Sequence, residues 1–146
     1  MKFLNSLQPL GLLILRAAIG VIFFAHGYPK LMHSDGPLQA TFVQHGLPAQ
    51  FVVVAGVLET FGGLLLVLGL FTRGAALLLA IELSIEILKL HSGRGIMALH
   101  EYEFPLALAA ACVALATVGA GSASVDHFLF GEGGPSRTRA AKPSKK

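Results

Sequence analysis

Residues 49–90 read AQFVVVAGVLETFGGLLLVLGLFTRGAALLLAIELSIEILKL, and this stretch decides the fold. It contains two apolar runs, 49–70 and 74–90, separated by a short turn at Thr72-Arg73-Gly74. Each run is close to the ~20 residues that a helix needs to cross a ~30 Å hydrocarbon core. Backbone amides in lipid must be satisfied within their own segment, so both runs are predicted to be helices. The short turn predicts that the two helices form an antiparallel hairpin.

Two further apolar runs, 10–28 and 104–120, have a similar length. The four runs predict an all-α protein, an up-down antiparallel bundle of four transmembrane helices within residues 1–130. The composition agrees, because 54% of the residues are hydrophobic and 13% are charged, against roughly 25% charged in a soluble domain. Residues 131–146 are rich in Gly, Pro and basic residues, and we expect a disordered tail there.

The distribution of charge predicts the orientation of the chain in the membrane. The formal net charge is +3, and the last ten residues include five basic ones: Arg137, Arg139, Lys142, Lys145 and Lys146. The positive-inside rule therefore predicts that both termini lie in the cytoplasm. The lipid bilayer is the expected partner, and nucleic acid is not, because no basic stripe is interleaved with aromatic residues. The one cysteine, Cys112, excludes an internal disulfide or a CxxC redox pair.

Three carboxyl groups interrupt the apolar runs: Glu59, Glu82 and Glu86. A carboxylate near the centre of a bilayer is costly, so such residues usually face a bundle interior, a partner charge or a water-filled cavity. Glu82 and Glu86 are four residues apart and share one helix face. The first run supplies the basic side chains Arg16 and His26, and Lys30 follows it, where we expect the edge of the membrane. We expect the long side chain of Arg16 to reach Glu59 or Glu82 from this helix.

Two interpretations of these intramembrane charges remain open. In one, the pairs only fix the register of the helices. In the other, they form a polar pocket that binds a small molecule or relays protons. Three carboxyl groups exceed the nearby cations, and this excess acid suits proton handling. On the second interpretation the candidate catalytic residues are Glu59, His26 and Arg16. The candidate cofactor-binding residues are Arg16, His26, Lys30, Glu59, Glu82 and Glu86. The other histidines have no metal-ligand spacing, so no metal site is predicted.

Three stretches of the chain resemble the DoxX family of small bacterial membrane proteins. Residues 15–31, LRAAIGVIFFAHGYPKL, resemble the first helix of the family, and residues 59–73, ETFGGLLLVLGLFTR, resemble the second helix and its turn. YEFPL at 102–106 and GAGSASVD at 119–126 resemble the fourth helix and its end. The similarity covers about residues 8–130. The polar positions that match the family are Arg16, His26, Lys30, Glu59, Arg73, Glu103 and Asp126. Glu82 and Glu86 lie where the family pattern is less fixed.

The resemblance implies a small bacterial membrane protein, with some relatives linked to quinone-coupled oxidation or oxidative stress. Together with the four apolar runs, it leads us to expect a multi-pass protein of the inner membrane with three alternative functions. The first is a subunit or module of a quinone-linked redox or oxidative-stress system, in which the chain is a component of a quinone-dependent oxidoreductase and quinone is the cofactor. The second is a non-catalytic membrane scaffold that recruits a soluble redox partner protein. The third is a small proton-coupled transporter, which four helices would form only as a homo-oligomer. Family membership alone does not decide among them.

Overall fold

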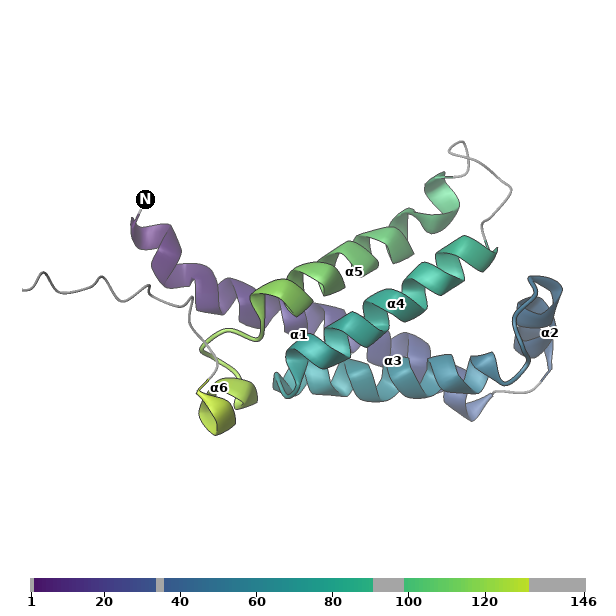
Figure 1. Ribbon diagram of the computed structural model, residues 1–146, viewed down its shortest axis with the longest axis horizontal. Coiled ribbons are helices and arrows are strands. Elements are labelled where there is room, and N and C mark those ends of the chain that lie inside the picture. The colour runs from purple at the N-terminus through teal and green to yellow at the C-terminus, as the bar shows by residue number, and fades with distance from the viewer. Residues whose placement is uncertain (1, 34–35, 91–98, 132–146) are drawn as a thin grey trace, which may run out of the picture.

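The computed structural model describes residues 2–33, 36–90 and 99–131, and these are all helical or connecting segments without a β-strand (Figure 1). The predicted all-α class is therefore confirmed for the described part of the chain. The predicted tail, apart from Gly131, lies outside the described residues. The helices are α1 (Lys2–Met32), α2 (Pro37–Gln44), α3 (Phe51–Leu68), α4 (Thr72–Leu90), α5 (Leu99–Val118) and α6 (Val125–Phe130).

Three of the described helices are long and apolar enough to cross a membrane. They contain the segments Ser6–Met32, Phe51–Leu68 and His100–Val118. Helix α4 has a similar length of 19 residues, but four of them are charged: Arg73, Glu82, Glu86 and Lys89. Length and composition thus identify three spans, where the apolar runs of the sequence predict four. The first helix is also longer than predicted, because α1 continues through Pro29 to Met32.

Helices α1 and α3 pack against each other in opposite directions and with almost no space between their backbones. A Cβ atom placed on Gly20 would lie 2.5 Å from the carbonyl oxygen of Gly63, and one placed on Gly27 would lie 2.5 Å from the amide nitrogen of Thr60. Later residues of α1 thus contact earlier residues of α3, as in any antiparallel pair of helices. Small residues at such positions let two helices approach closely, so these glycines set the register of α1 on α3.

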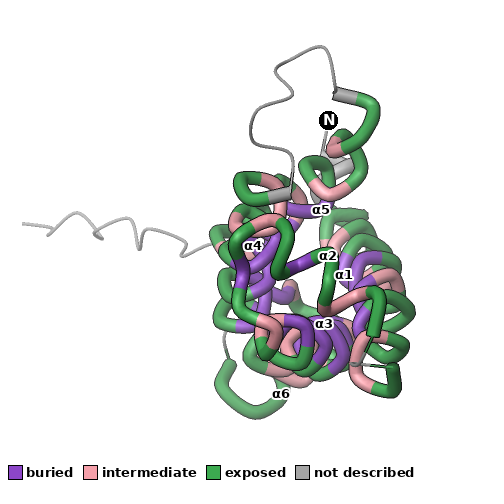
Figure 2. The backbone as a smooth tube through the Cα atoms, turned by 90° about the vertical axis from the view of Figure 1, so that its right-hand side faces the viewer, coloured by how far each residue is buried: buried purple, intermediate pink, exposed green. Residues whose placement is uncertain are grey.

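The four long helices surround a common core, as the view along the molecule shows (Figure 2). The largest fully buried apolar side chains include Phe23 from α1, Leu66 from α3, Leu79 from α4 and Leu115 from α5. Cys112 is fully buried among them, which fits an inert core residue. Outward-facing apolar side chains are abundant on the same helices. That distribution suits a protein whose surroundings are lipid.

Two short helices lie at opposite ends of the long ones (Figure 1). Helix α2 contributes Phe42 to a small core with Leu47 and Val52. Helix α6 docks on the connection between α3 and α4. The carboxylate of Asp126 accepts hydrogen bonds from the amides of Phe71 (2.6 Å) and Thr72 (2.9 Å), and the Asp126 amide donates to the Gly69 carbonyl (2.8 Å). Asp126 therefore satisfies amides at the beginning of α4 that have no partner within the helix.

Candidate functional site

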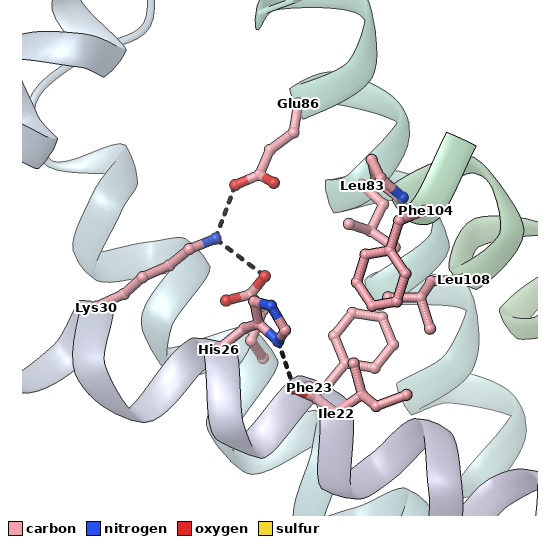
Figure 3. A pocket seen from close by; sticks show the side chains of 10 residues that line it. Ile22, Phe23, His26, Lys30, Leu83, Glu86, Phe104 and Leu108 are labelled. Carbon is pink, nitrogen blue, oxygen red and sulfur yellow. Dashed lines mark hydrogen bonds and ion pairs between the residues drawn. The ribbon is translucent and has the colours of Figure 1, made fainter. Parts of the chain in front are cut away.

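One ammonium group joins three helices. The Nζ atom of Lys30 on α1 lies 3.0 Å from Oε1 of Glu59 on α3 and 3.0 Å from Oε1 of Glu86 on α4 (Figure 3). The Glu59 side chain is buried, and those of Lys30 and Glu86 are largely buried. The predicted meeting of basic groups on the first helix with acidic groups on the others is thus found, with Lys30 as the cation.

A cavity of about 200 Å³ lies beside this ion pair. Its polar side is formed by His26, Lys30, Glu59 and Glu86. Its apolar walls come from α1, α4 and α5, and consist of Ile22, Phe23, Leu83, Phe104, Pro105 and Leu108 (Figure 3). Pockets that bind small molecules are commonly apolar with a few convergent polar groups. Four of the six predicted cofactor-binding residues therefore line one cavity. A fifth, Glu82, does not line it but has a carboxyl oxygen within 4.8 Å of those of Glu59 and Glu86.

The imidazole of His26 is held in a defined state. Its Nδ1 atom lies 2.8 Å from the carbonyl oxygen of Ile22, one turn earlier on α1. A carbonyl oxygen can only accept, so Nδ1 carries a proton and donates it. The other nitrogen, Nε2, is then left for a ligand. The ring lies 5.9 Å from that of Phe104, centroid to centroid, so His26 and Phe104 bring α1 and α5 together at the cavity.

Glu82 is the most deeply buried of the three carboxyl groups and has no counter-ion at hydrogen-bonding distance. The residue is 2% exposed, and neither of its carboxyl oxygens has a hydrogen-bond partner among the described residues. The Oε2 atom of Glu59 is likewise buried without a partner. Carboxyl oxygens of Glu59, Glu82 and Glu86 lie within 4.8 Å of one another. A metal ion bound by all three would have to displace the Lys30 ammonium, which already pairs with two of them.

The prediction that Arg16 reaches Glu59 or Glu82 is wrong. Arg16 is buried at the other end of the bundle, where its guanidinium donates to the carbonyl of Ala120 (3.2 Å) and to that of Ala123. Arg16 precedes Lys30 by fourteen residues, which is about 21 Å along a helix. This separation is too large for the two cations to serve one site. Arg16 instead holds the segment that connects α5 to α6.

Six of the seven polar residues singled out by the resemblance thus divide into two groups. His26, Lys30 and Glu59 lie at the cavity. Three others lie at the opposite end, near α6: Arg16, Asp126 and Arg73, whose guanidinium is 3.5 Å from the carbonyl of Val118. Glu103 lies outside the cavity lining and is 3.5 Å from His100. The apolar wall on α5 was not predicted as part of the site. Phe104 and Pro105 lie in the YEFPL stretch that resembles the family, but neither they nor Leu108 has a polar group that points to a ligand.

Comparisons with known proteins agree with this architecture. The family model named DoxX matches residues 11–92. CatD of Bacillus subtilis, whose name marks it as a provisional oxidoreductase, is 32% identical over 127 residues, covering 87% of this chain and 92% of CatD. An uncharacterized protein of Haemophilus influenzae is 31% identical over 89% of this chain and 98% of its own length. The inner membrane protein YphA of Escherichia coli is 37% identical over 51% of this chain and 54% of its own. No solved structure matches the chain. The family match and these alignments establish that the chain is a membrane protein of the DoxX family.

Proposed function

We propose that this chain is a component of a quinone-linked redox system of the bacterial inner membrane, and that the cavity beside Lys30 binds a quinone head group. The observation that carries the proposal is the convergence of four polar residues on one side of a cavity whose other walls are apolar: His26, Lys30, Glu59 and Glu86. A quinone has the matching chemistry, a hydrophobic ring bearing polar oxygens. The relative named as a provisional oxidoreductase supports a redox role.

The proposed topology has four spans, with α1, α3, α4 and α5 crossing the membrane up and down and both termini in the cytoplasm. Helix α4 is included despite its charges, because their positions suit a span. Glu82 and Glu86 face the bundle interior, while Arg73 and Lys89 lie at the helix ends. Long basic side chains at helix ends reach the membrane surface, whereas intramembrane acids face inward.

Bound in the cavity, a quinone would accept electrons and protons. The residues of this chain would supply binding and protons. The Lys30 ammonium is a donor for one quinone oxygen, and the Nε2 atom of His26 is available to the same head group. Glu59 and Glu86 accept hydrogen bonds from the Lys30 ammonium and hold it in place. An ammonium that had given up a proton would be an amine, and either carboxyl group could return a proton to it after taking one up itself. A soluble redox partner protein is the proposed source of the electrons.

The proposal is tested by photolabelling the purified protein in lipid nanodiscs with an azido derivative of a short-chain quinone. Labelled peptides are then mapped by mass spectrometry. We expect the label on residues 22–30 and 104–108, and competition by the unmodified short-chain quinone. His26→Phe should weaken labelling about tenfold, equivalent to ~1.4 kcal/mol, while His127→Phe on α6 should leave it unchanged. Labelling spread over all lipid-facing helices, without competition, would contradict the proposal and favour a non-catalytic scaffold.

A further inference from the structure

The charges of the buried cluster do not balance. Lys30 supplies one positive charge, and its two hydrogen bonds are made to Glu59 and Glu86. Glu82 adds a third carboxyl group that lies close to both of the others. If all three were ionised, the cluster would carry a net charge of −2 in a region with little water. Isolated buried charges are among the most costly features a protein can hold.

The surroundings of Glu82 provide acceptors but no cation at bonding distance. The charged and titratable groups that face it are Glu59 from α3, Glu86 from its own helix, Lys30 from α1 and the Cys112 thiol from α5. The ammonium of Lys30 is hydrogen-bonded to the other two carboxyl groups. Among the described residues, both oxygens of Glu82 and the Oε2 atom of Glu59 are buried without a partner.

A proton on one carboxyl group reduces the excess negative charge of the cluster and needs no additional ligands. A protonated carboxyl group is neutral, which removes the cost of a buried charge. Its O–H group can donate to a neighbouring carboxylate, and such bonds to charged acceptors are short and strong. Two carboxyl groups held close together with one shared proton are a known arrangement, because like charges at that distance resist joint ionisation.

We propose that Glu82 is a neutral carboxylic acid that donates a hydrogen bond to the carboxylate of Glu59 or Glu86, so that the cluster stores one proton behind the cavity. Glu82 itself does not line the cavity. Any proton it gives must therefore pass through Glu59 or Glu86. In that step the O–H bond of Glu82 breaks, the neighbouring carboxylate gains the proton, and Glu82 becomes the carboxylate. Delivery to a cavity ligand rests on the proposed function, whereas storage of the proton does not.

Infrared spectroscopy of the purified protein in nanodiscs tests the stored proton directly, with no quinone present. A protonated buried carboxyl group has its own carbonyl stretching band, which shifts in heavy water. We expect this band at neutral pH in the wild type and in the matched control Glu103→Gln. It should be absent from Glu82→Gln, whose amide is nearly isosteric. A band that survives in Glu82→Gln, or a wild type without the band, overturns the proposal.

Two additions keep the test decisive. Should Glu82→Gln fail to fold, Glu82→Asp retains the carboxyl group on a shorter stem and should shift the band, so an unmoved band would overturn the assignment. Titration with Mn²⁺ alone tests the competing metal site. Stoichiometric Mn²⁺ binding by a wild type that shows no band would show that a cation, not a proton, neutralises the cluster. Because no quinone is used, failure here leaves the photolabelling result standing, and the reverse also holds.

Discussion

Gly20 and Gly63 bring the backbones of α1 and α3 together, because a side chain on either would meet the other helix's main chain within 2.5 Å. This contact fixes how far α1 is displaced along α3. The same displacement places Lys30 beside Gly56 on α3, from where its ammonium reaches Glu59, about one turn further along that helix. The position of the ion pair is therefore set by two residues that have no polar side chain.

The first prediction concerns this close approach. Gly20→Ala should destabilise the protein by about 1–3 kcal/mol, because even one methyl group requires α1 and α3 to separate. Gly11→Ala in the same helix is the matched control, since nothing lies within 4 Å of a Cβ at that position. The control should be neutral or stabilising by up to about 1 kcal/mol, from helix propensity. Thermal unfolding in detergent measures both, and equal melting temperatures would contradict the packing described above.

The second prediction concerns the cation of the cluster. Lys30→Met should cost about 3–5 kcal/mol of stability, the range seen when one partner of a buried ion pair is removed. Lys89→Met, an identical change near the end of α4, should have a small effect because that residue is exposed. The double variant Lys30→Met/Glu59→Gln should recover part of the loss, since it removes one of the stranded carboxylates. Additive losses in this double-mutant cycle would mean that the two residues do not interact.

The third prediction separates the two polar ends of the bundle. Arg16→Met should speed hydrogen–deuterium exchange in residues 119–126, because the carbonyls of Ala120 and Ala123 lose their donor. The expected loss of stability is about 1–3 kcal/mol. Arg73→Met is the control, because its one described bond is long and exposed. Quinone photolabelling should be unchanged in Arg16→Met. Loss of labelling in a folded variant would restore Arg16 to the catalytic role that the sequence suggested.

The fourth prediction fills the cavity. Leu108 lies on its α5 wall and is 9% exposed. Leu108→Phe should extend into the space and reduce photolabelling about tenfold, or ~1.4 kcal/mol, while stability changes little because a void is filled. Leu106→Phe, on the exposed side of the same helix, introduces the same residue away from the cavity and should label as the wild type does. Equal labelling in both variants would place the quinone elsewhere.

The sequence predicted well the placement of residues that would be energetically costly in contact with lipid. Glu59 and Glu82 stand out because a carboxyl group is costly within an apolar run, and both are buried inside the bundle. The antiparallel hairpin of α3 and α4 follows from the shortness of the connection. The turn itself lies slightly earlier than predicted, at residues 69–71, where Gly69 adopts the left-handed conformation that ends many helices.

The partner of Arg16 was not predictable in the same way. Its guanidinium binds two backbone carbonyls, those of Ala120 and Ala123. Every residue has a carbonyl, so the type of residue gives no indication of which one Arg16 binds. Charge complementarity pointed to Glu59 and Glu82 instead. Lys30 was expected at the membrane edge, but the helix continues past Pro29 to Met32 and carries its ammonium into the bundle. Pairing of opposite charges in the sequence therefore identified the buried carboxyl groups correctly, but it selected Arg16 where the structure has Lys30.

The cap that Asp126 places on α4 has a consequence for the order in which the chain assembles. Ribosomes synthesise α4 more than thirty residues before they reach Asp126, so the amides of Phe71 and Thr72 must wait for the last helix to emerge. Until then, the hairpin of α3 and α4 is held by packing alone, and the helix start stays open to water or headgroups. This end of α4 can therefore be completed only after residue 126 has been synthesised.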